Sequence, residues 1–309
     1  MSNNQNIAKR FSIRPLIFGP GAVGSVLGYI LESLGMSPRF VNRVGKLIDH
    51  KATIESMDVV HQVYFNVEWE LQDVSLIFVA TKAGDLDAAL GRIKAMDLPM
   101  VPVIVLCNGA VDEIMERYKS VFGHQLRRGI VTIPVKRQAD THWLISGNKG
   151  EVRWGIWQDG SISHQERYLS ELAKSHRLYF DAKVEKSVRK KWLFNTCLNS
   201  LCADLNLSTN GEALDHTNIL KSLFSESWDL GELLWCSWDA SPEEVFSELV
   251  SLINATELNQ NSMVQDIRSG RKTESYFLAG QALVDPKLFP KLFEIHLRIE
   301  SRYRGYISD

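Results

Sequence analysis

The chain has 309 residues, 45% of them hydrophobic and 23% charged, which is typical of a globular protein long enough for two domains sharing a cleft. A formal net charge of −2 gives no indication of a nucleic acid or an anionic membrane as the main partner. The longest apolar runs, such as residues 74–80, are far shorter than the roughly 20 residues of a membrane helix. The first ten residues are polar and lack the apolar segment of a secretory signal, so we expect a cytoplasmic protein.

The N-terminal half alternates short apolar strands with helical patterns, after a tail (residues 1–13) that we expect to be flexible. Strands are predicted at residues 15–18, 39–42, 74–80 and 103–106. Helices are predicted at about 22–34, where Gly35 marks the end, and at about 85–96. This alternation indicates a parallel sheet with helices on both faces. Residues 130–155 are typical of β-hairpins, with turn residues at 146–150.

The pattern changes near residue 184, where apolar residues begin to recur with a period near 3.6 and strand signals become few. Helices are predicted at residues 188–205, 218–238, 242–255 and 287–303. The sequence therefore predicts an α/β protein with a Rossmann-type dinucleotide-binding domain (residues 1–183) followed by an all-α domain (residues 184–309).

A glycine-rich turn, Gly-Pro-Gly-Ala-Val-Gly at residues 19–24, lies between the first strand and the first helix. It fits the GxGxxG pattern in the context that dinucleotide binding requires. The first glycine allows a tight turn, the second lets the backbone approach a pyrophosphate, and the third allows close packing of helix on strand. An ordinary tight turn is the alternative. The predicted cofactor-binding residues of this turn are Gly19, Gly21, Ala22, Val23 and Gly24.

The second strand ends in a basic segment that indicates NADP(H). An NAD-binding site usually carries an acidic residue here to hold the ribose 2′-hydroxyl, but no acid lies between Glu32 and Asp49. Arg43, together with Lys46, has the charge to pair with a 2′-phosphate. A solvated basic loop is the alternative interpretation.

Lys191, Asn195 and Asn199 are spaced i, i+4, i+8, which places them on one stripe about 12 Å long along a predicted helix. Their neighbours in sequence are mostly apolar, and burying a lysine and two asparagines without partners is costly. The stripe therefore either meets other polar groups in a wet cleft or faces solvent, where Glu, Lys and Arg would be more usual.

Several sequence fragments occur in an order and at spacings that resemble the ketopantoate reductase family over most of the chain. The matching fragments are Thr81-Lys82-Ala83, Leu106-Cys107-Asn108-Gly109, Lys191 to Asn199, Asn210-Gly211-Glu212, and the segment from Ser262 to Glu274. The resemblance implies an NADPH-dependent reduction of 2-dehydropantoate (ketopantoate) to pantoate, a step toward pantothenate.

The resemblance also implies residue roles. Lys191 would donate a proton to the ketone oxygen while hydride arrives from the nicotinamide, and Glu274 would work with it and hold the substrate hydroxyl. A cationic lysine suits this role because reduction builds negative charge on that oxygen. Lys82 would lie near the nicotinamide ribose and Arg43 near the 2′-phosphate. The residues expected to orient the substrate are Asn108, which is also a cofactor-binding candidate, Asn195, Asn199 and Ser262.

Several alternatives stay open at this point. Residues 280–288 are shorter than is usual in the family, which leaves the exact 2-oxo acid undetermined, so another branched 2-oxo acid is an alternative substrate. A non-catalytic NADP(H)-binding sensor and a 3-hydroxy acid dehydrogenase are alternative functions. The eight histidines show no metal-ligand spacing and the four cysteines form no CxxC pair, so we expect neither a metal nor a disulfide framework. The expected partner is a small 2-oxo acid, and a homodimer is compatible with the sequence.

Overall fold

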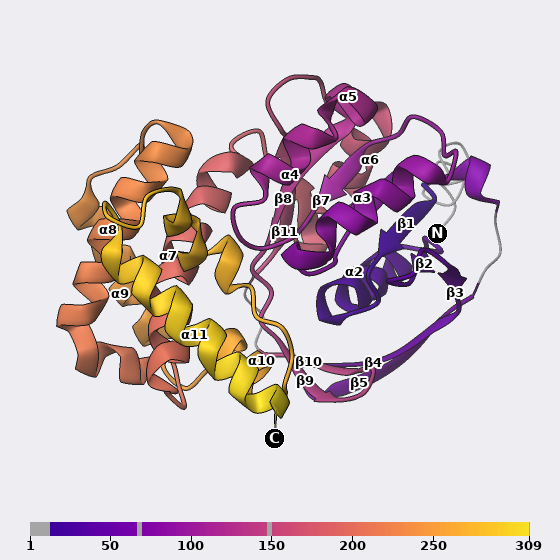
Figure 1. Cartoon of the computed structure of the whole chain (residues 1–309). Helices are drawn as coiled ribbons and strands as arrows, with labels where there is room; N and C mark the ends of the chain where they lie inside the picture. Colours follow the sequence, from indigo (N-terminus) through magenta and orange to yellow (C-terminus); the bar gives the residue numbers. More distant parts are fainter. Residues whose placement is uncertain (1–12, 67–69, 147–149, 309) are drawn as a thin grey trace. The chain divides into compact units, whose positions relative to one another are not determined.

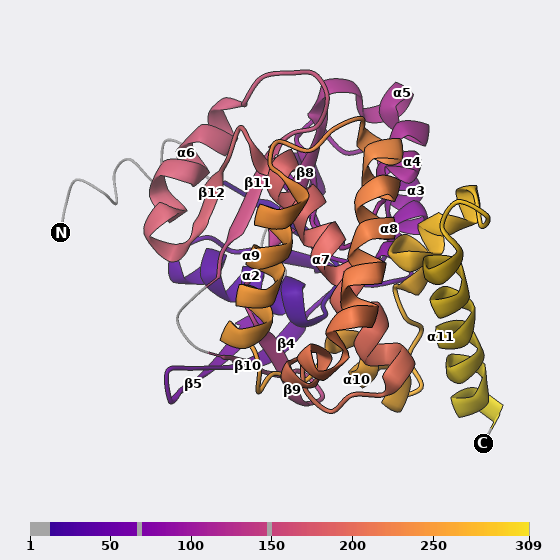
Figure 2. The same cartoon turned by 90° about the vertical axis from the view of Figure 1, so that its left-hand side faces the viewer.

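The structure is a computed structural model that describes residues 13–66, 70–146 and 150–308. The predicted tail, apart from Ile13, and the middle of the predicted turn at 146–150 lie outside these residues. The chain divides into two compact units, which Figures 1 and 2 show with their elements labelled. The first unit is Met1–Cys107 with Asp112–Glu185, and the second is Asn108–Val111 with Lys186–Asp309. The segment Asn108–Val111 therefore packs with the second unit, although it lies within the predicted first domain.

The first unit is built on an eight-stranded sheet with the order β12-β11-β8-β7-β6-β1-β2-β3. Its strands are β1 (Pro15–Phe18), β2 (Arg39–Val41), β3 (Leu47–Ile48), β6 (Leu76–Val79), β7 (Val103–Val105), β8 (Leu126–Val131), β11 (Val152–Ile156) and β12 (Leu178–Phe180). Five neighbouring strands from β2 to β8 are parallel, whereas β3 and β11 run antiparallel to β2 and β8. The α/β prediction is confirmed, with a mixed rather than an all-parallel sheet. Every residue of β1, β6 and β7 is buried, as expected for strands covered on both faces.

A second sheet has four strands in the order β5-β4-β10-β9. Its antiparallel β9–β10 pair lies within residues 130–155, where hairpins were predicted, whereas β4 and β5 were not predicted. The strands are β4 (His50–Ser56), β5 (Val59–Phe65), β9 (Val135–Ala139) and β10 (His142–Ile145). Helix α2 (Ala22–Ser33) contacts β1 of the large sheet and β4, β9 and β10 of the small one, an arrangement visible in Figure 1. Gly28 makes this packing close, because a Cβ at that position would lie 2.7 Å from the Phe40 ring.

The other helices of the first unit are short. They are α3 (Leu86–Ala95), α4 (Asp112–Arg117), α5 (Lys119–Phe122) and α6 (His164–Ala173), with 3₁₀ turns at Leu71–Asp73, Ala83–Asp85, Gly123–Gln125 and Lys174–His176. Helix α6 begins with a capping box in which Ser163 and Glu166 exchange hydrogen bonds with each other's backbone N–H groups.

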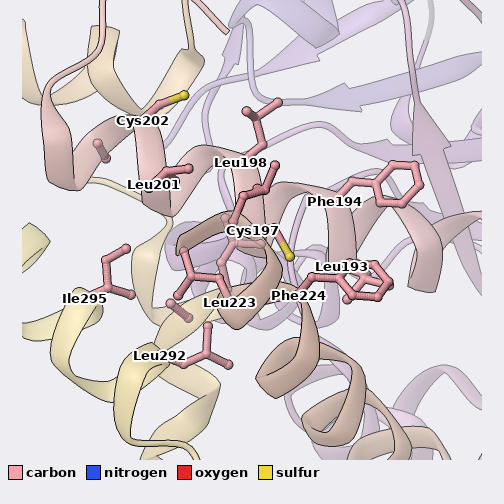
Figure 3. Packing of buried hydrophobic residues seen from close by; sticks show 14 of the residues in the cluster. Leu193, Phe194, Cys197, Leu198, Leu201, Cys202, Leu223, Phe224, Leu292 and Ile295 are labelled. Carbon is pink, nitrogen blue, oxygen red and sulfur yellow. The ribbon is translucent and has the colours of Figure 1, made fainter. Parts of the chain in front are cut away.

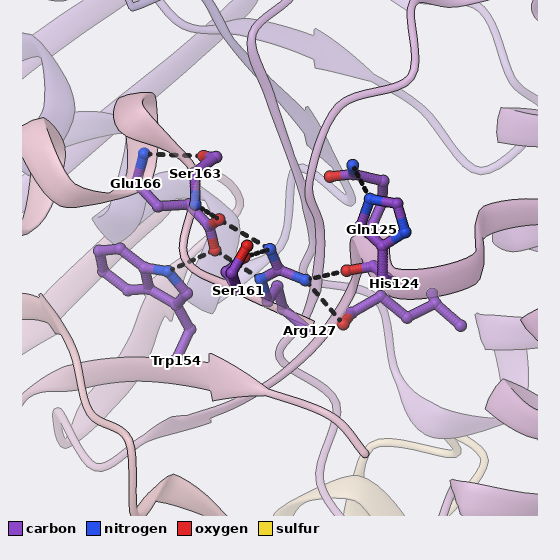
Figure 4. A network of polar contacts seen from close by, with 8 residues as sticks. His124, Gln125, Arg127, Trp154, Ser161, Ser163 and Glu166 are labelled. Atoms are coloured by element: carbon purple, nitrogen blue, oxygen red, sulfur yellow. Dashed lines mark hydrogen bonds and ion pairs between the residues drawn. The ribbon is translucent and has the colours of Figure 1, made fainter. Parts of the chain in front are cut away.

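Glu166 also joins α6 to the sheet through a buried ion pair (Figure 4). Arg127 of β8 donates from Nε at 2.7 Å and from Nη2 at 2.9 Å to the two carboxylate oxygens. The Trp154 indole donates to the same carboxylate, and Arg127 also donates to the Ser161 and His124 carbonyl oxygens. Because both charges are fully buried and their polar atoms are paired, removal of either partner would leave an uncompensated charge in the core.

Helices and 3₁₀ turns are the regular secondary structure of the second unit in its described residues. Its helices are α7 (Val184–Leu205, whose first two residues belong to the first unit), α8 (Thr217–Trp235), α9 (Pro242–Ala255), α10 (Ser262–Arg268) and α11 (Pro290–Ser308), with 3₁₀ turns at Gly211–His216, Ser275–Phe277 and Ala279–Val284. Leu193 and Cys197 of α7 pack in one core with Leu223 of α8 and Leu292 of α11 (Figure 3). Each fully buried leucine contributes about 1.5–3 kcal/mol through removal of apolar surface from water.

The four cysteines are free, and three of them, Cys107, Cys197 and Cys202, are buried. Burial raises the pKa of both the Cys197 and the Cys202 thiol to about 12. In the described part of the chain, none of the helices has the length and apolar character needed to cross a bilayer.

Candidate active site

The glycine turn follows the carboxyl end of β1, at the point in the sheet where the strand order reverses. β1 lies between β2 and β6, so the chain leaves β1 on one side and returns on the other, which is the position where open α/β sheets bind ligands. Gly19 has φ +101°, and a Cβ there would lie 2.9 Å from the Ala80 carbonyl oxygen. A Cβ at Gly24 would overlap the carbonyl oxygen of Gly19. Both glycines are therefore required by the fold of the turn itself.

Gly21 differs from these two glycines. It is exposed, its φ is −84°, and a Cβ built on it would meet no atom within 4 Å. It is also the N-cap of α2, which has neither a capping side chain nor an acidic residue in its first turn, where Ala22 and Val23 begin the helix. The first N–H groups of such a helix are suited to a phosphate. A close ligand gives a physical reason for a glycine that the turn alone does not need.

Two buried polar side chains, those of Ser25 and His50, contact each other beside the glycine turn. Ser25 Oγ lies 2.9 Å from His50 Nε2 and 3.5 Å from the Pro20 carbonyl oxygen. The His50 ring also contacts the rings of Phe40 and Phe65. Burial lowers the pKa of His50, so the neutral ring is favoured in this position.

The predicted 2′-phosphate residue, Arg43, lies in a tight loop after β2. Asn42 Oδ1 accepts hydrogen bonds from the backbone N–H groups of Val44 and Lys46. The Arg43 side chain is 82% exposed and forms an ion pair at 2.9 Å with Asp85. Lys82 is exposed at the N-cap of the 3₁₀ turn that contains Asp85, so this ion pair joins the two predicted cofactor segments.

Arg92 is a further cation at this loop, and neither it nor Asp85 was among the residues predicted from the sequence. A Cβ at Gly45 would lie 2.7 Å from Arg92 Cδ, so the arginine packs against the loop that carries Arg43. The helical pattern of residues 85–96 gave no sign of this contact, because it depends on the path of the loop.

Three of the predicted residues come together within the second unit. Lys191 Nζ donates a hydrogen bond to Asn108 Oδ1 at 2.7 Å, and Asn108 Nδ2 donates to Glu274 Oε2 at 3.3 Å. All three side chains are half-buried. An amine, an amide and a carboxylate thus form one connected polar group, although they belong to segments far apart in the sequence.

Most of each unit matches a known family. Residues 16–159 match the family described as ketopantoate reductase PanE/ApbA, and residues 183–284 match its C-terminal domain. The chain belongs to the ketopantoate reductase family. Members of this family are NAD(P)-dependent oxidoreductases that act on a ketone, and the chain is an enzyme of this class.

Two 2-dehydropantoate 2-reductases share about a quarter of their aligned residues with this chain. The 2-dehydropantoate 2-reductase of Archaeoglobus fulgidus is 24% identical over 277 residues, covering 86% of this chain and 88% of the relative. The corresponding protein of Pyrococcus horikoshii is 25% identical over 290 residues, covering 88% and 90%. A D-mandelate dehydrogenase structure with NADH and anilino(oxo)acetate aligns with a TM-score of 0.80 at 20% identity, covering 96% of this chain and 100% of that one. A dimeric ketopantoate reductase from Staphylococcus aureus aligns with a TM-score of 0.73 at 16% identity, covering 95% of this chain and 100% of that one. At these identities the structures show a shared fold.

The remaining predicted substrate-binding residues lie on helices α7 and α10. Asn195 is half-buried on the stripe of α7, while Asn199 Oδ1 accepts a hydrogen bond from Asn261 Nδ2 at 2.9 Å. Ser262 is exposed as the first residue of α10, and Asn261 is the residue that caps this helix through the Met263 N–H.

Asn261 was not predicted from the sequence, although it is only 4% exposed and also donates to Asn210 at 3.3 Å. An Asn directly before a helical segment is a capping signal that could have indicated it. The amide network of Asn199, Asn210 and Asn261 fixes one end of the polar stripe.

The strand end that leads to Asn108 is also held firmly. Arg128, a fully buried residue of β8, donates from Nη1 to the Cys107 carbonyl oxygen at 3.0 Å. Cys107 Sγ in turn donates to the Thr81 carbonyl oxygen at 3.1 Å. These contacts lie within the first unit and give both the carbonyl and the thiol of Cys107, the residue before Asn108, a hydrogen-bond partner. Among the described residues there is no group of three or more His, Cys, Asp or Glu placed to hold a metal ion.

Proposed function

We propose that the chain catalyses NADPH-dependent reduction of 2-dehydropantoate to pantoate. The observation that carries this proposal is the connected group of Lys191, Asn108 and Glu274, with bonds of 2.7 and 3.3 Å. A lysine can supply the proton that such a reduction needs. Asn108 accepts a hydrogen bond from the lysine amine, and Glu274 accepts one from Asn108.

In the proposed reaction the bound dinucleotide supplies the hydride. Lys191 stabilises the negative charge that develops on the ketone oxygen and then delivers its proton there. Asn108 accepts a hydrogen bond from the amine, which restricts the lysine to a few conformations before substrate arrives. Glu274, which accepts a hydrogen bond from Asn108, is proposed to accept another from a substrate hydroxyl. Asn195, Asn199 and Ser262 are proposed to orient the substrate.

The cofactor proposal rests on the first unit. The open N-terminus of α2 and the exposed Gly21 fit a pyrophosphate, and Arg43 fits a 2′-phosphate because a guanidinium pairs with phosphate bidentately. We assign Gly19, Ala22, Val23, Gly24 and Lys82 to the same dinucleotide site. The preference for NADPH over NADH depends on Arg43, whose present partner is Asp85.

The test is a kinetic comparison of two neighbouring lysines. Wild-type protein should oxidise NADPH when ketopantoate is added, followed by the loss of nicotinamide absorbance. Lys191→Ala should lower kcat by about 10²- to 10⁴-fold, the range of general acid catalysis, while retaining NADPH binding. Lys190→Ala is the matched control, because Lys190 is the adjacent residue and pairs with Glu248 at 2.7 Å on the surface.

Each outcome decides a separate point. Near-normal turnover by Lys191→Ala would remove this lysine as the proton donor. Tight NADPH binding without oxidation by any 2-oxo acid would instead favour a sensor. A second substrate to include is benzoylformate, the 2-oxo acid that corresponds to mandelate, because the D-mandelate dehydrogenase structure shares the fold over 96% of this chain.

A further inference from the structure

One backbone carbonyl in the second unit connects the three segments that carry Asn108, Lys191 and Glu274. The Phe277 carbonyl oxygen accepts a hydrogen bond from the Ala110 N–H at 2.9 Å and another from the Trp192 indole Nε1 at 3.1 Å. The Phe277 N–H donates to the Glu274 carbonyl oxygen at 2.9 Å. Ala110 lies two residues after Asn108, and Trp192 directly follows Lys191.

The contact between the first and third of these segments is tight. Gly109 has φ +84°, and a Cβ there would lie 2.5 Å from Phe277 Cβ and 2.9 Å from its carbonyl oxygen. Only glycine lets the chain pass this close in this conformation. The position of Asn108 is therefore set against the Phe277 backbone.

The second segment is attached through Trp192, which is 1% exposed. A buried indole N–H needs an acceptor, and loss of that acceptor would leave an unpaired donor at a cost of about 1–3 kcal/mol. The ring also packs edge-on against Trp235, with ring centroids 4.9 Å apart. Successive residues of a helix point about 100° apart, so Trp192 enters the core while Lys191 lies on the polar stripe.

We infer that Trp192 is a positioning residue for the proposed reaction: its indole N–H fixes helix α7 to the Phe277 carbonyl and so holds the Lys191 amine at Asn108, whose amide is hydrogen-bonded to Glu274. The inference rests on the proposed function for its catalytic meaning. A displacement of about 1 Å in such a group can cost about 100-fold in rate, even when the altered residue touches no substrate.

The experiment replaces Trp192 with Phe, which removes the N–H and keeps an aromatic ring. The matched control is Trp238→Phe, because the Trp238 indole also donates to a carbonyl of this unit, that of Trp228, at 3.1 Å. Trp192→Phe should lower kcat at least about 10-fold and leave the NADPH dissociation constant unchanged, whereas Trp238→Phe should keep kcat within about twofold.

A second readout does not depend on turnover. The rate at which a small acylating reagent modifies the Lys191 amine, measured by peptide mass spectrometry, should rise in Trp192→Phe and stay at the wild-type value in Trp238→Phe. Gly109→Ala, which forces the Asn108 segment away from Phe277, should raise the same rate and covers the case in which Trp192→Phe fails to fold.

The outcomes separate this inference from the proposed function. If wild-type protein reduces no 2-oxo acid but Lys191 reactivity still rises in Trp192→Phe and not in Trp238→Phe, the reaction is wrong and the positioning role stands. If both tryptophan variants lower kcat equally, or if Trp192→Phe keeps wild-type kcat and Lys191 reactivity, the positioning role is overturned.

Discussion

Gly21→Ala separates a glycine needed for a ligand from one needed for the fold. In the protein alone the added methyl meets nothing within 4 Å, and φ of −84° is allowed for alanine. Loss of glycine at an N-cap destabilises a helix by about 1 kcal/mol at most, and reduced freedom of the unfolded chain offsets about 0.4–1 kcal/mol of this. The free energy of unfolding should therefore change by less than about 1 kcal/mol.

Dinucleotide binding should respond much more strongly to the same methyl group. The substitution places a carbon where the backbone of residue 21 would approach the pyrophosphate, which moves the phosphates away from the first N–H groups of α2. Loss of one hydrogen bond to a charged group costs about 1.5–3 kcal/mol. At about 1.4 kcal/mol per tenfold, the NADPH dissociation constant should rise about 10- to 100-fold.

The assay pairs thermal unfolding with calorimetric titration of NADPH, and Gly24→Ala gives the opposite pattern as a control. A Cβ at Gly24 overlaps the Gly19 carbonyl oxygen, so this variant should lose about 1–3 kcal/mol of stability with no ligand present. Wild-type NADPH affinity in a folded Gly21→Ala protein would refute the assignment of the pyrophosphate to this turn.

Three further predictions concern buried or exposed groups elsewhere in the chain. Glu166→Gln should lower the free energy of unfolding in urea by about 3–5 kcal/mol, because it leaves a buried guanidinium without its counter-charge. Burial lowers the pKa of His50, so the stability that the neutral ring contributes is present above about pH 6.5 and is lost as the pH falls. His50→Gln should therefore reduce the dependence of the free energy of unfolding on pH below about 6.5, measured by unfolding at several pH values. In a thiol titration of the folded protein, the exposed Cys236 should react fast, and Cys236→Ser should lack this fast reaction. Cys197 and Cys202 should react only on unfolding, because burial raises the pKa of both thiols to about 12.

The sequence predicted the parts of the fold whose signals are local. The strand at 15–18 and the helix at 242–255 have the predicted bounds, because an apolar run before glycine and a Ser-Pro helix start are contained in a few residues. The strands β4 and β5 were missed, although buried residues alternate with less buried ones along most of β4. Their turn uses Met57 and Asp58 at positive φ, which is not a residue pair that announces a hairpin.

The site divides in the same way. The stripe of Lys191 follows from helical spacing, whereas its contacts do not, because Asn108 and Glu274 approach it through tertiary structure. Lys191, Asn108 and Glu274 were predicted from the resemblance to the ketopantoate reductase family. That resemblance did not name Asn261, Trp192 or Asp85, whose roles depend on hydrogen bonds and ion pairs between segments distant in sequence.

Asp85 gives the last prediction, which concerns the choice between NADPH and NADH. Its carboxylate pairs with Arg43 at 2.9 Å, and the side chains are 32% and 82% exposed. A 2′-phosphate would compete with this carboxylate for the guanidinium, and exposed pairs of this kind contribute only about 0.2–1 kcal/mol. Asp85→Asn should therefore tighten NADPH binding by up to about fivefold and leave NADH binding unchanged, with a smaller effect at high salt. Arg43→Gln should weaken NADPH binding alone. If Asp85→Asn shifts both cofactors equally, or Arg43→Gln leaves their affinity ratio as in the wild type, Arg43 does not read the 2′-phosphate.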